Sequence, residues 1–350
     1  MTFSLRTALA VLLLACAIPA RAAWAEETLR VCNWTNYMPK STLADFTRDT
    51  GIRVEYSTYE GNEELYARMR APGGSGCDVV VPSSYAVQRL RGEGLLAKLD
   101  HAKLANLGNL DPALLGKPFD PGNDYSLPYL WGGTGILVDT TRVDPRLAAS
   151  WADLWRPQFR GLLLLPDDPR EVFGIALRVL GKSVNETSPA VLEQAAKKLV
   201  TLMPGVRAVD SGDPKALVLS GAVAVAAMWN GDAYQAQLVN PLLEFVWPKE
   251  GGLLWMDCLA IPKDSPRTAE AHAFLDYLLR PGVAASASLE LGYATPNQAA
   301  VGYLPPALQY NWVVNPPPGV VQRSEFQEFV GDAAALYEKR WAELRLRIMQ

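Results

Sequence analysis

Apolar residues recur along this chain with the periods of two kinds of structure. Short apolar runs predict buried strands, and segments with an apolar residue every three or four positions predict amphipathic helices. Ser41 can begin one such helix and Gly51 can end it, and a second helix is predicted over 61–71. The predicted strands are Leu29–Asn33, Ile52–Tyr56, Val79–Val81, Gly135–Val138, Leu162–Leu165, Val206–Val209, Ala222–Met228, Leu243–Val246 and Leu259–Ile261.

Strands that alternate with helices in this way are typical of an α/β fold, with a mostly parallel sheet covered by helices on both faces. A chain of 350 residues is long enough for two domains with their own cores. The last segment, Ser324–Ile348, is rich in Ala, Leu, Glu and Arg and is predicted to be one long helix. No internal repeat or low-complexity tract interrupts the pattern.

The first 25 residues have the pattern of a secretory signal. Arg6 is the only charge before the apolar run Leu9–Ile18, and small residues follow at positions typical of cleavage sites. The run is too short to span a bilayer. Two interpretations remain open: cleavage after Ala25, or lipidation at Cys16, which ends a lipobox-like Leu-Leu-Ala-Cys. We therefore expect a periplasmic protein, either free or lipid-anchored.

Charge and cysteine content narrow the function classes further. The net charge is −4, and it becomes −6 once Arg6 and Arg21 leave with the signal, which argues against a nucleic-acid partner. The remaining cysteines, Cys32, Cys77 and Cys258, are odd in number and show no paired spacing. We expect them to be buried thiols without a structural disulfide.

Aromatic residues and carboxylates gather where ligand-binding loops are expected. In α/β domains ligands bind at the carboxyl ends of the strands. The first strand ends in Asn33-Trp34-Thr35-Asn36-Tyr37, and the third in Pro82-Ser83-Ser84-Tyr85. The later segments with such residues are Pro166–Glu171, Trp229–Asp232, Trp255–Asp257 and the loop around Tyr293.

This chemistry points to an organic cation. A buried ammonium group needs a carboxylate or fixed dipoles around it. Faces of tryptophan and tyrosine attract cations and also cover methylene groups. A polyamine, which joins ammonium groups by methylene chains, matches both features. An anion would require arginine, lysine or glycine-rich helix starts, and these loops contain few.

The same residues carry a resemblance to a known family. The chain resembles the spermidine/putrescine-binding proteins of bacterial ABC transporters in seven stretches, in order along nearly the whole mature chain. These are Asn33–Tyr37, Asp78–Tyr85, Ser150–Trp155, Asp167–Phe173, Met228–Ala233, Glu250–Pro262 and Leu291–Asn297.

The resemblance implies a type II periplasmic binding protein fold, with a ligand cleft between two α/β lobes joined by hinge crossovers. We expect crossings near Gly132–Gly135, Trp255–Asp257 and Val301–Leu304. The first lobe would combine 26–132 with 256–302, and the second 133–255 with 303–350. The resemblance implies two partners, a small polyamine and the permease subunits of an ABC importer. It also implies that the binding protein is a monomer. No cofactor and no metal are implied.

The resemblance also assigns site roles residue by residue. The aromatic box around the methylene chain would consist of Trp34, Tyr37, Tyr85, Trp229, Trp255 and Tyr293. Carboxylates that hold the amines would be Asp168, Glu171 and Asp257, and polar groups that position a ligand end would be Thr35, Ser83 and Gln327.

Two positions depart from the pattern of spermidine-binding relatives. Asn36 replaces an acidic residue that would pair with a terminal amine. Asp232 is a carboxylate of the putrescine-preferring branch. The chain thus loses one expected charge and gains another, so the choice between a diamine and a triamine stays open, with a slight preference for spermidine.

Several other interpretations remain possible from the sequence alone. Asp168, Glu171 and Asp232 could favour helix starts instead of binding ligand. Gln327 has no support apart from the resemblance. A carboxylate pair could belong to a glycosidase-type cleft hydrolase. A serine hydrolase would need a GxSxG motif, which the sequence lacks. No Walker A motif is present, so an ATPase would have to be another subunit. A loaded receptor that signals to a partner is the third possibility. We expect a binding protein and not an enzyme.

Overall fold

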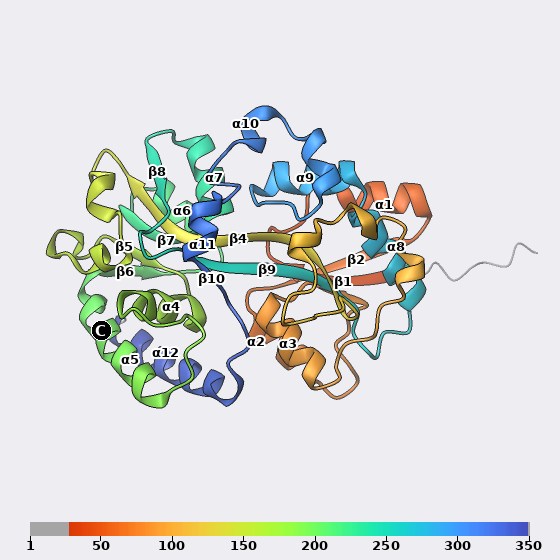
Figure 1. Cartoon of the computed structure of the whole chain (residues 1–350), viewed down its shortest axis with the longest axis horizontal. Helices are drawn as coiled ribbons and strands as arrows, with labels where there is room; N and C mark the ends of the chain where they lie inside the picture. The colour runs from red at the N-terminus through yellow and green to blue at the C-terminus, as the bar shows by residue number, and fades with distance from the viewer. Residues whose placement is uncertain (1–27, 349–350) are drawn as a thin grey trace, which may run out of the picture.

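The computed structural model describes residues 28–348, and it forms two lobes that share one twisted sheet (Figure 1). The predicted signal sequence over 1–25, with the lipidation candidate Cys16, lies outside the described residues. Within them, no helix is both long and apolar enough to cross a membrane.

The strands of the shared sheet run in the order β2-β1-β3-β9-β4-β7-β5-β6, with β10 beside β9 and β8 beside β4. Each lobe repeats one arrangement: three parallel strands, with the first in the middle, followed by an antiparallel strand. The strands are β1 (Thr28–Trp34), β2 (Arg53–Tyr59), β3 (Val79–Val80), β4 (Ser126–Asp139), β5 (Leu163–Leu165), β6 (Val206–Val209), β7 (Val225–Trp229), β8 (Leu243–Val246), β9 (Leu253–Ala260) and β10 (Glu325–Phe326).

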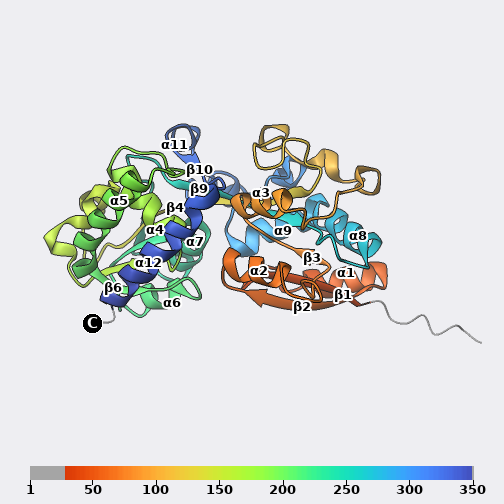
Figure 2. The same cartoon turned by 90° about the horizontal axis from the view of Figure 1, so that it is seen from below.

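Helices pack on both faces of the sheet, as the alternation of strands and helices predicts (Figures 1 and 2). We call the part around β1–β3 the first lobe and the part around β5–β8 the second lobe. The first lobe carries α1 (Thr42–Thr50), α2 (Asn62–Met69), α3 (Ser84–Gly92), α8 (Thr268–Leu278) and α9 (Pro281–Leu291). The second carries α4 (Pro169–Val179), α5 (Pro189–Leu202), α6 (Pro214–Leu219), α7 (Asn230–Val239) and α12 (Ala334–Ile348), and α10 (Pro306–Gln309) and α11 (Pro318–Arg323) lie along the returning chain.

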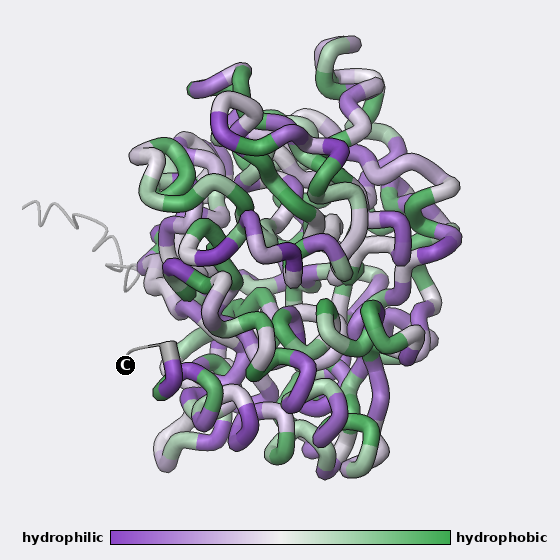
Figure 3. Tube along the Cα trace, turned by 90° about the vertical axis from the view of Figure 1, so that its left-hand side faces the viewer, coloured by the Kyte–Doolittle hydropathy of each residue, from purple (hydrophilic) through white to green (hydrophobic). Residues whose placement is uncertain are grey.

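Each lobe has its own hydrophobic core. Phe46 and Phe274 belong to the core of the first lobe, where their rings meet edge to face. Trp151, Phe173 and Trp341 belong to the core of the second lobe. From the side of the second lobe, apolar and polar residues alternate along its outer helices, because one face of each helix is buried (Figure 3).

Two long antiparallel strands, β4 and β9, connect the lobes (Figure 1). The strand predicted as Gly135–Val138 is the second half of β4, and the one predicted as Leu259–Ile261 is the end of β9. Glycines let the neighbours of β4 approach closely: a Cβ on Gly133 would lie 2.8 Å from the carbonyl oxygen of Leu253. The predicted lobe boundaries remain a prediction.

The expectation of unpaired cysteines is wrong for two of the three. Cys32 and Cys77 form a disulfide, with their Cα atoms 5.9 Å apart, whereas Cys258 is a free, buried thiol. Cys32 lies in β1, and Cys77 lies two residues before β3, the parallel neighbour of β1. The two are 45 residues apart in sequence, so their spacing gives no indication of the pair.

The predicted long terminal helix is also wrong in its first ten residues. The chain from Glu325 to Phe326 forms β10, which adds to the edge of β9, and α12 begins only at Ala334. Pairing with β9 satisfies backbone groups that a helix would satisfy internally, so tertiary contacts override the helical composition. This change places Gln327 in an extended, buried segment.

Candidate ligand-binding site

A cavity of about 260 Å³ lies between the two lobes, beside the connecting strands. The structure brings all fourteen predicted site residues onto its wall. They are Trp34, Thr35, Asn36, Tyr37, Ser83, Tyr85, Asp168, Glu171, Trp229, Asp232, Trp255, Asp257, Tyr293 and Gln327. Their roles in ligand binding remain a prediction, whereas their convergence is a property of the fold.

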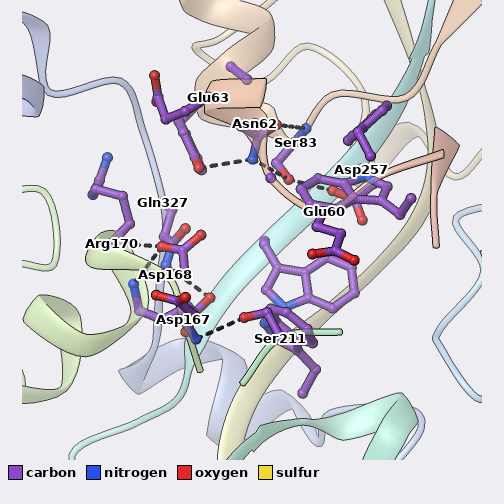
Figure 4. Close-up of a pocket in the computed structure, with 18 of the residues that line it drawn as sticks. Glu60, Asn62, Glu63, Ser83, Asp167, Asp168, Arg170, Ser211, Asp257 and Gln327 are labelled. Carbon is purple, nitrogen blue, oxygen red and sulfur yellow. Dashed lines mark hydrogen bonds between the residues drawn. The ribbon is translucent and has the colours of Figure 1, made fainter. Parts of the chain in front are cut away.

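Asp257 is one acidic centre of the cavity. It lies inside β9, and its Oδ1 accepts a hydrogen bond of 2.6 Å from the hydroxyl of Ser83. The Ser83 hydroxyl in turn accepts a hydrogen bond from the side-chain amide of Asn62, at the start of α2 (Figure 4). Burial raises the pKa of Asp257 to about 7, although the Ser83 hydrogen bond opposes part of the rise. An ammonium ion beside this carboxylate would favour its ionised form.

Asp168 and Glu171 form a second acidic centre at the first turn of α4. Asp168 caps the helix by accepting hydrogen bonds from the backbone N–H groups of Arg170 and Glu171. The side-chain amide of Gln327 donates to Oε1 of Glu171 at 3.2 Å, while the buried Oε2 has no hydrogen-bond partner among the described residues. Burial and the neighbouring Asp168 raise the pKa of Glu171 to about 8.

The helix-start interpretation of Asp168 is therefore compatible with a place in the cavity. One carboxylate oxygen caps α4, and the residue still lines the cavity. Figure 4 shows Asp168 and Gln327 on one side of the cavity and Asp257 on the other. Two acidic centres thus face each other across the space where a ligand would lie.

Aromatic rings form much of the wall between these centres. Trp255 and Tyr293 are in edge-to-face contact with ring centroids 5.1 Å apart, and Tyr37 continues the series 5.6 Å from Tyr293. The indole N–H of Trp34 donates to the carbonyl of Val81, which fixes the ring beside Tyr59. The hydroxyl of Tyr37 and the indole nitrogen of Trp255 are buried without a partner among the described residues.

Thr35 and Asn36 lie in the exposed turn after β1, at the rim of the cavity. Asn36 has a φ of 56°, in the left-handed region that asparagine tolerates better than most residues. This conformation gives a backbone reason for asparagine at position 36.

Trp229 and Tyr85 also line the cavity. Trp229 ends β7, and the Tyr85 hydroxyl accepts a hydrogen bond from Asn62.

Asp232 lines the cavity, but its oxygens are already engaged by protein groups. Lys215 Nζ lies 2.9 Å from Oδ1, and the Tyr293 hydroxyl donates to Oδ2 at 3.2 Å. Among the four predicted carboxylates it is the one paired with a cation side chain within hydrogen-bonding distance.

Sequence reasoning missed several residues of the wall. Asn62 positions Ser83, Lys215 pairs with Asp232, and Arg170 lies between the rings of Tyr85 and Tyr337. Arg170 lies within the predicted segment Pro166–Glu171, but a cationic side chain was not expected to line a site for a cation. Asn62 and Lys215 lie at helix starts outside the predicted binding segments. With all wall residues included, eight carboxylates face three cationic side chains: Glu60, Glu63, Asp167, Asp168, Glu171, Asp232, Asp257 and Glu338 against Arg89, Arg170 and Lys215.

Such a cavity suits the capture of a small cation. It combines an excess of carboxylates with aromatic walls, and residues from both lobes and from the connecting strands contribute to it. The fold and the site together define a solute-binding protein with its ligand between two lobes.

The chain belongs to the bacterial extracellular solute-binding protein family, whose model matches residues 41–312. It is 45% identical to a spermidine/putrescine-binding periplasmic protein of Salmonella typhimurium over 95% of both chains. It is 32% identical to a putrescine/cadaverine-binding protein of Pseudomonas aeruginosa, over 94% of this chain and 96% of that one.

The fold is likewise that of solved structures in this class. A spermidine/putrescine ABC transporter substrate-binding protein from Streptococcus pneumoniae is 32% identical and matches with a TM-score of 0.78, over 91% of this chain and 99% of that one. These matches confirm the predicted two-lobed α/β fold. Family membership also confirms that the chain is a solute-binding protein and not a hydrolase.

Proposed function

We propose that this protein captures a small polyamine, of the putrescine or spermidine type, in the periplasm and delivers it to the permease of an ABC importer. The observation that carries the proposal is the second acidic centre: Glu171 is buried on the cavity wall with Oε2 unpartnered. A buried carboxylate oxygen is unfavourable unless a cation or donor reaches it. A ligand ammonium group supplies both.

The rest of the wall supports the same ligand class. Trp255 and Tyr293 offer ring faces and edges to methylene groups and cations. Asp257 lies across the cavity from Asp168 (Figure 4). The relatives in Salmonella typhimurium and Pseudomonas aeruginosa are named for binding spermidine, putrescine or cadaverine.

Closure of the lobes would link binding to delivery. Residues of the first lobe, such as Tyr37, and of the second lobe, such as Glu171, line one cavity. A ligand that contacts both sets favours the arrangement in which they lie close together. The closed protein would then dock on the permease as a monomer, with the lobes divided near the predicted crossings. The relatives are periplasmic, in agreement with the predicted export signal.

Calorimetric titration of the mature chain tests this function. Putrescine, cadaverine, spermidine and spermine are titrated in turn, with glutamate as an anionic control. One-to-one binding to at least one amine, and none to glutamate, is the expected result. Absence of binding to all four amines would overturn the proposal. Loss of polyamine uptake on deletion of the gene, restored by the wild-type protein, tests delivery.

A further inference from the structure

The wall of the cavity contains an ammonium group of its own. Lys215 belongs to α6, and its Nζ lies 2.9 Å from Oδ1 of Asp232 and 2.7 Å from Oε1 of Gln235. The Lys215 side chain is 22% exposed and that of Asp232 is 17% exposed, so water screens this ion pair only in part.

Asp232 also contacts the first lobe. Its Oδ2 accepts a hydrogen bond from Tyr293, while Gln235 donates to the backbone carbonyls of Glu290 and Leu291. Lys215, Asp232 and Gln235 belong to the second lobe, so this network joins the lobes at one end of the cavity. Each oxygen of Asp232 therefore has a protein donor.

The other two acidic centres differ from Asp232 in this respect. Asp257 receives its short hydrogen bond from a neutral hydroxyl, and Glu171 receives one from the neutral amide of Gln327. Neither forms an ion pair with a described lysine or arginine within 4.0 Å. A ligand ammonium can thus join them without displacing a cation, whereas at Asp232 it would compete with Lys215 and meet a like charge.

We propose that Lys215 is a specificity-determining residue: its ammonium group occupies Asp232 and leaves two buried acidic centres for the ligand, which selects diamines over longer polyamines. This inference rests on the proposed polyamine-binding function and names the ligand class within it. The two remaining centres are Asp257 and the Asp168–Glu171 pair, one for each end of a diamine.

A variant series at Lys215 tests the proposal. Lys215→Ala removes the charge and opens space beside Asp232, and Lys215→Arg keeps the charge. The dissociation constants for putrescine and spermidine are measured for each, and again with Asp232→Asn added to Lys215→Ala. In contrast to the slight preference for spermidine drawn from the sequence, we expect the wild type to favour putrescine, because Lys215 engages Asp232. Lys215→Ala should shift the ratio of the two constants roughly tenfold toward spermidine.

Two further results complete the expected pattern. Lys215→Arg should keep the wild-type ratio, and Asp232→Asn added to Lys215→Ala should cancel the shift. In the wild-type background, Asp232→Asn should weaken putrescine binding far less than Asp257→Asn does.

Three outcomes would overturn the proposal. One is a wild-type preference for spermidine. Another is an equal change in both dissociation constants for Lys215→Ala. That result would mean that Lys215 stabilises the contact between the lobes and does not select the ligand. The third is a loss for Asp232→Asn as large as for Asp257→Asn, which makes Asp232 a direct ligand contact.

Failure of the underlying function gives a different result. If the wild type binds none of the amines, the proposed function falls. Lys215→Ala still decides the inference in that case, because a freed Asp232 predicts a gain of spermidine binding over the wild type. Absence of that gain would overturn the inference as well.

Discussion

The hydroxyl of Ser83 donates a 2.6 Å hydrogen bond to Oδ1 of Asp257, and 174 positions of the sequence separate the two residues. Ser83 precedes α3 in the first lobe, and Asp257 lies on a strand that connects the lobes. The bond holds one oxygen of the carboxylate, so the carboxylate enters ligand binding already oriented. Such preorganisation lowers the entropy lost on binding.

Replacing Asp257 by asparagine should weaken amine binding roughly tenfold to a hundredfold. The amide keeps the shape of the carboxylate but loses its charge, and hydrogen bonds to charged groups contribute about 1.5–3 kcal/mol. Calorimetric titration measures the change. Glu244→Gln removes one negative charge from an exposed position of β8, and it should leave the affinity near the wild-type value. Equal losses in the two variants would mean that only net charge matters.

Replacing Trp255 by alanine should weaken binding by at least about tenfold. The indole forms part of the wall against Tyr293, and a cation on a desolvated aromatic face gains about 2 kcal/mol. Trp312→Ala is the matched control, because Trp312 is 47% exposed and does not line the cavity. Wild-type affinity in Trp255→Ala would exclude the indole from the ligand contact.

Amine affinity should rise as the pH increases from 6 to 8.5. Buried Glu171, with a pKa raised to about 8, and Asp257, with a pKa raised to about 7, both hold protons over part of this range. An ammonium ligand favours the ionised carboxyl groups, so binding must release protons, and it releases fewer as the pH rises. Alkyl ammonium groups titrate near the lysine value of about 10.4 and stay charged.

Calorimetry in two buffers of different ionisation enthalpy counts the released protons. Glu171→Gln should lose the upper part of the pH dependence and keep the part below about pH 7 that belongs to Asp257. A flat affinity profile in the wild type would contradict the raised pKa values.

Reduction of the disulfide between Cys32 and Cys77 should lower the free energy of unfolding by roughly 4 kcal/mol, from the chain entropy of a loop of this length. Denaturant unfolding of the mature chain, with and without reductant, measures the loss. Cys258→Ala, which keeps the bridge, should respond to reductant like the wild type. Three reactive thiols in the denatured, unreduced chain would show that the bridge is absent.

Asn230 hydrogen-bonds the connecting strand β4 to the returning chain at Val313 and Val314, and replacing it should destabilise the fold. Its Oδ1 accepts from the N–H of Gly133, and its amide donates to the carbonyls of Val313 and Val314. Asn230→Ala leaves buried backbone groups unpaired and should cost about 2–4 kcal/mol. Asn240→Ala, where the side chain accepts one hydrogen bond from Leu242, should cost clearly less in the same urea titration. Similar losses for both would exclude this role.

Local signals predicted much of the fold and the site. The ends of β1 and β3, marked by Trp34 and Ser83, converge because parallel strands end at the same edge of a sheet. Trp229 ends β7 of the second lobe, which runs in the opposite sense, and it reaches the cavity from the other lobe. The bounds of α1 could also be predicted from the sequence. The helix follows Ser41, and it is ended by Gly51, whose backbone has the left-handed conformation.

Pairings between distant segments could not be predicted. The Cys32–Cys77 bridge depends on β1 and β3 being neighbours, and the ion pair of Lys215 with Asp232 depends on how α6 packs beside α7. Gln327 came only from the resemblance, because its segment has a helical composition and becomes extended through pairing with β9. These features follow from tertiary structure, which local periodicity does not encode.

The return of the chain along β9 has a consequence for the order in which the protein is made. Gln327, which hydrogen-bonds to Glu171, directly follows β10, the strand that pairs with β9, and both Gln327 and β10 belong to the last 26 residues of the 350-residue chain. A polypeptide that is still emerging from the ribosome or the export channel lacks this closing segment. A chain truncated before position 325 would lack both this closing segment and α12, whose Trp341 belongs to the core of the second lobe.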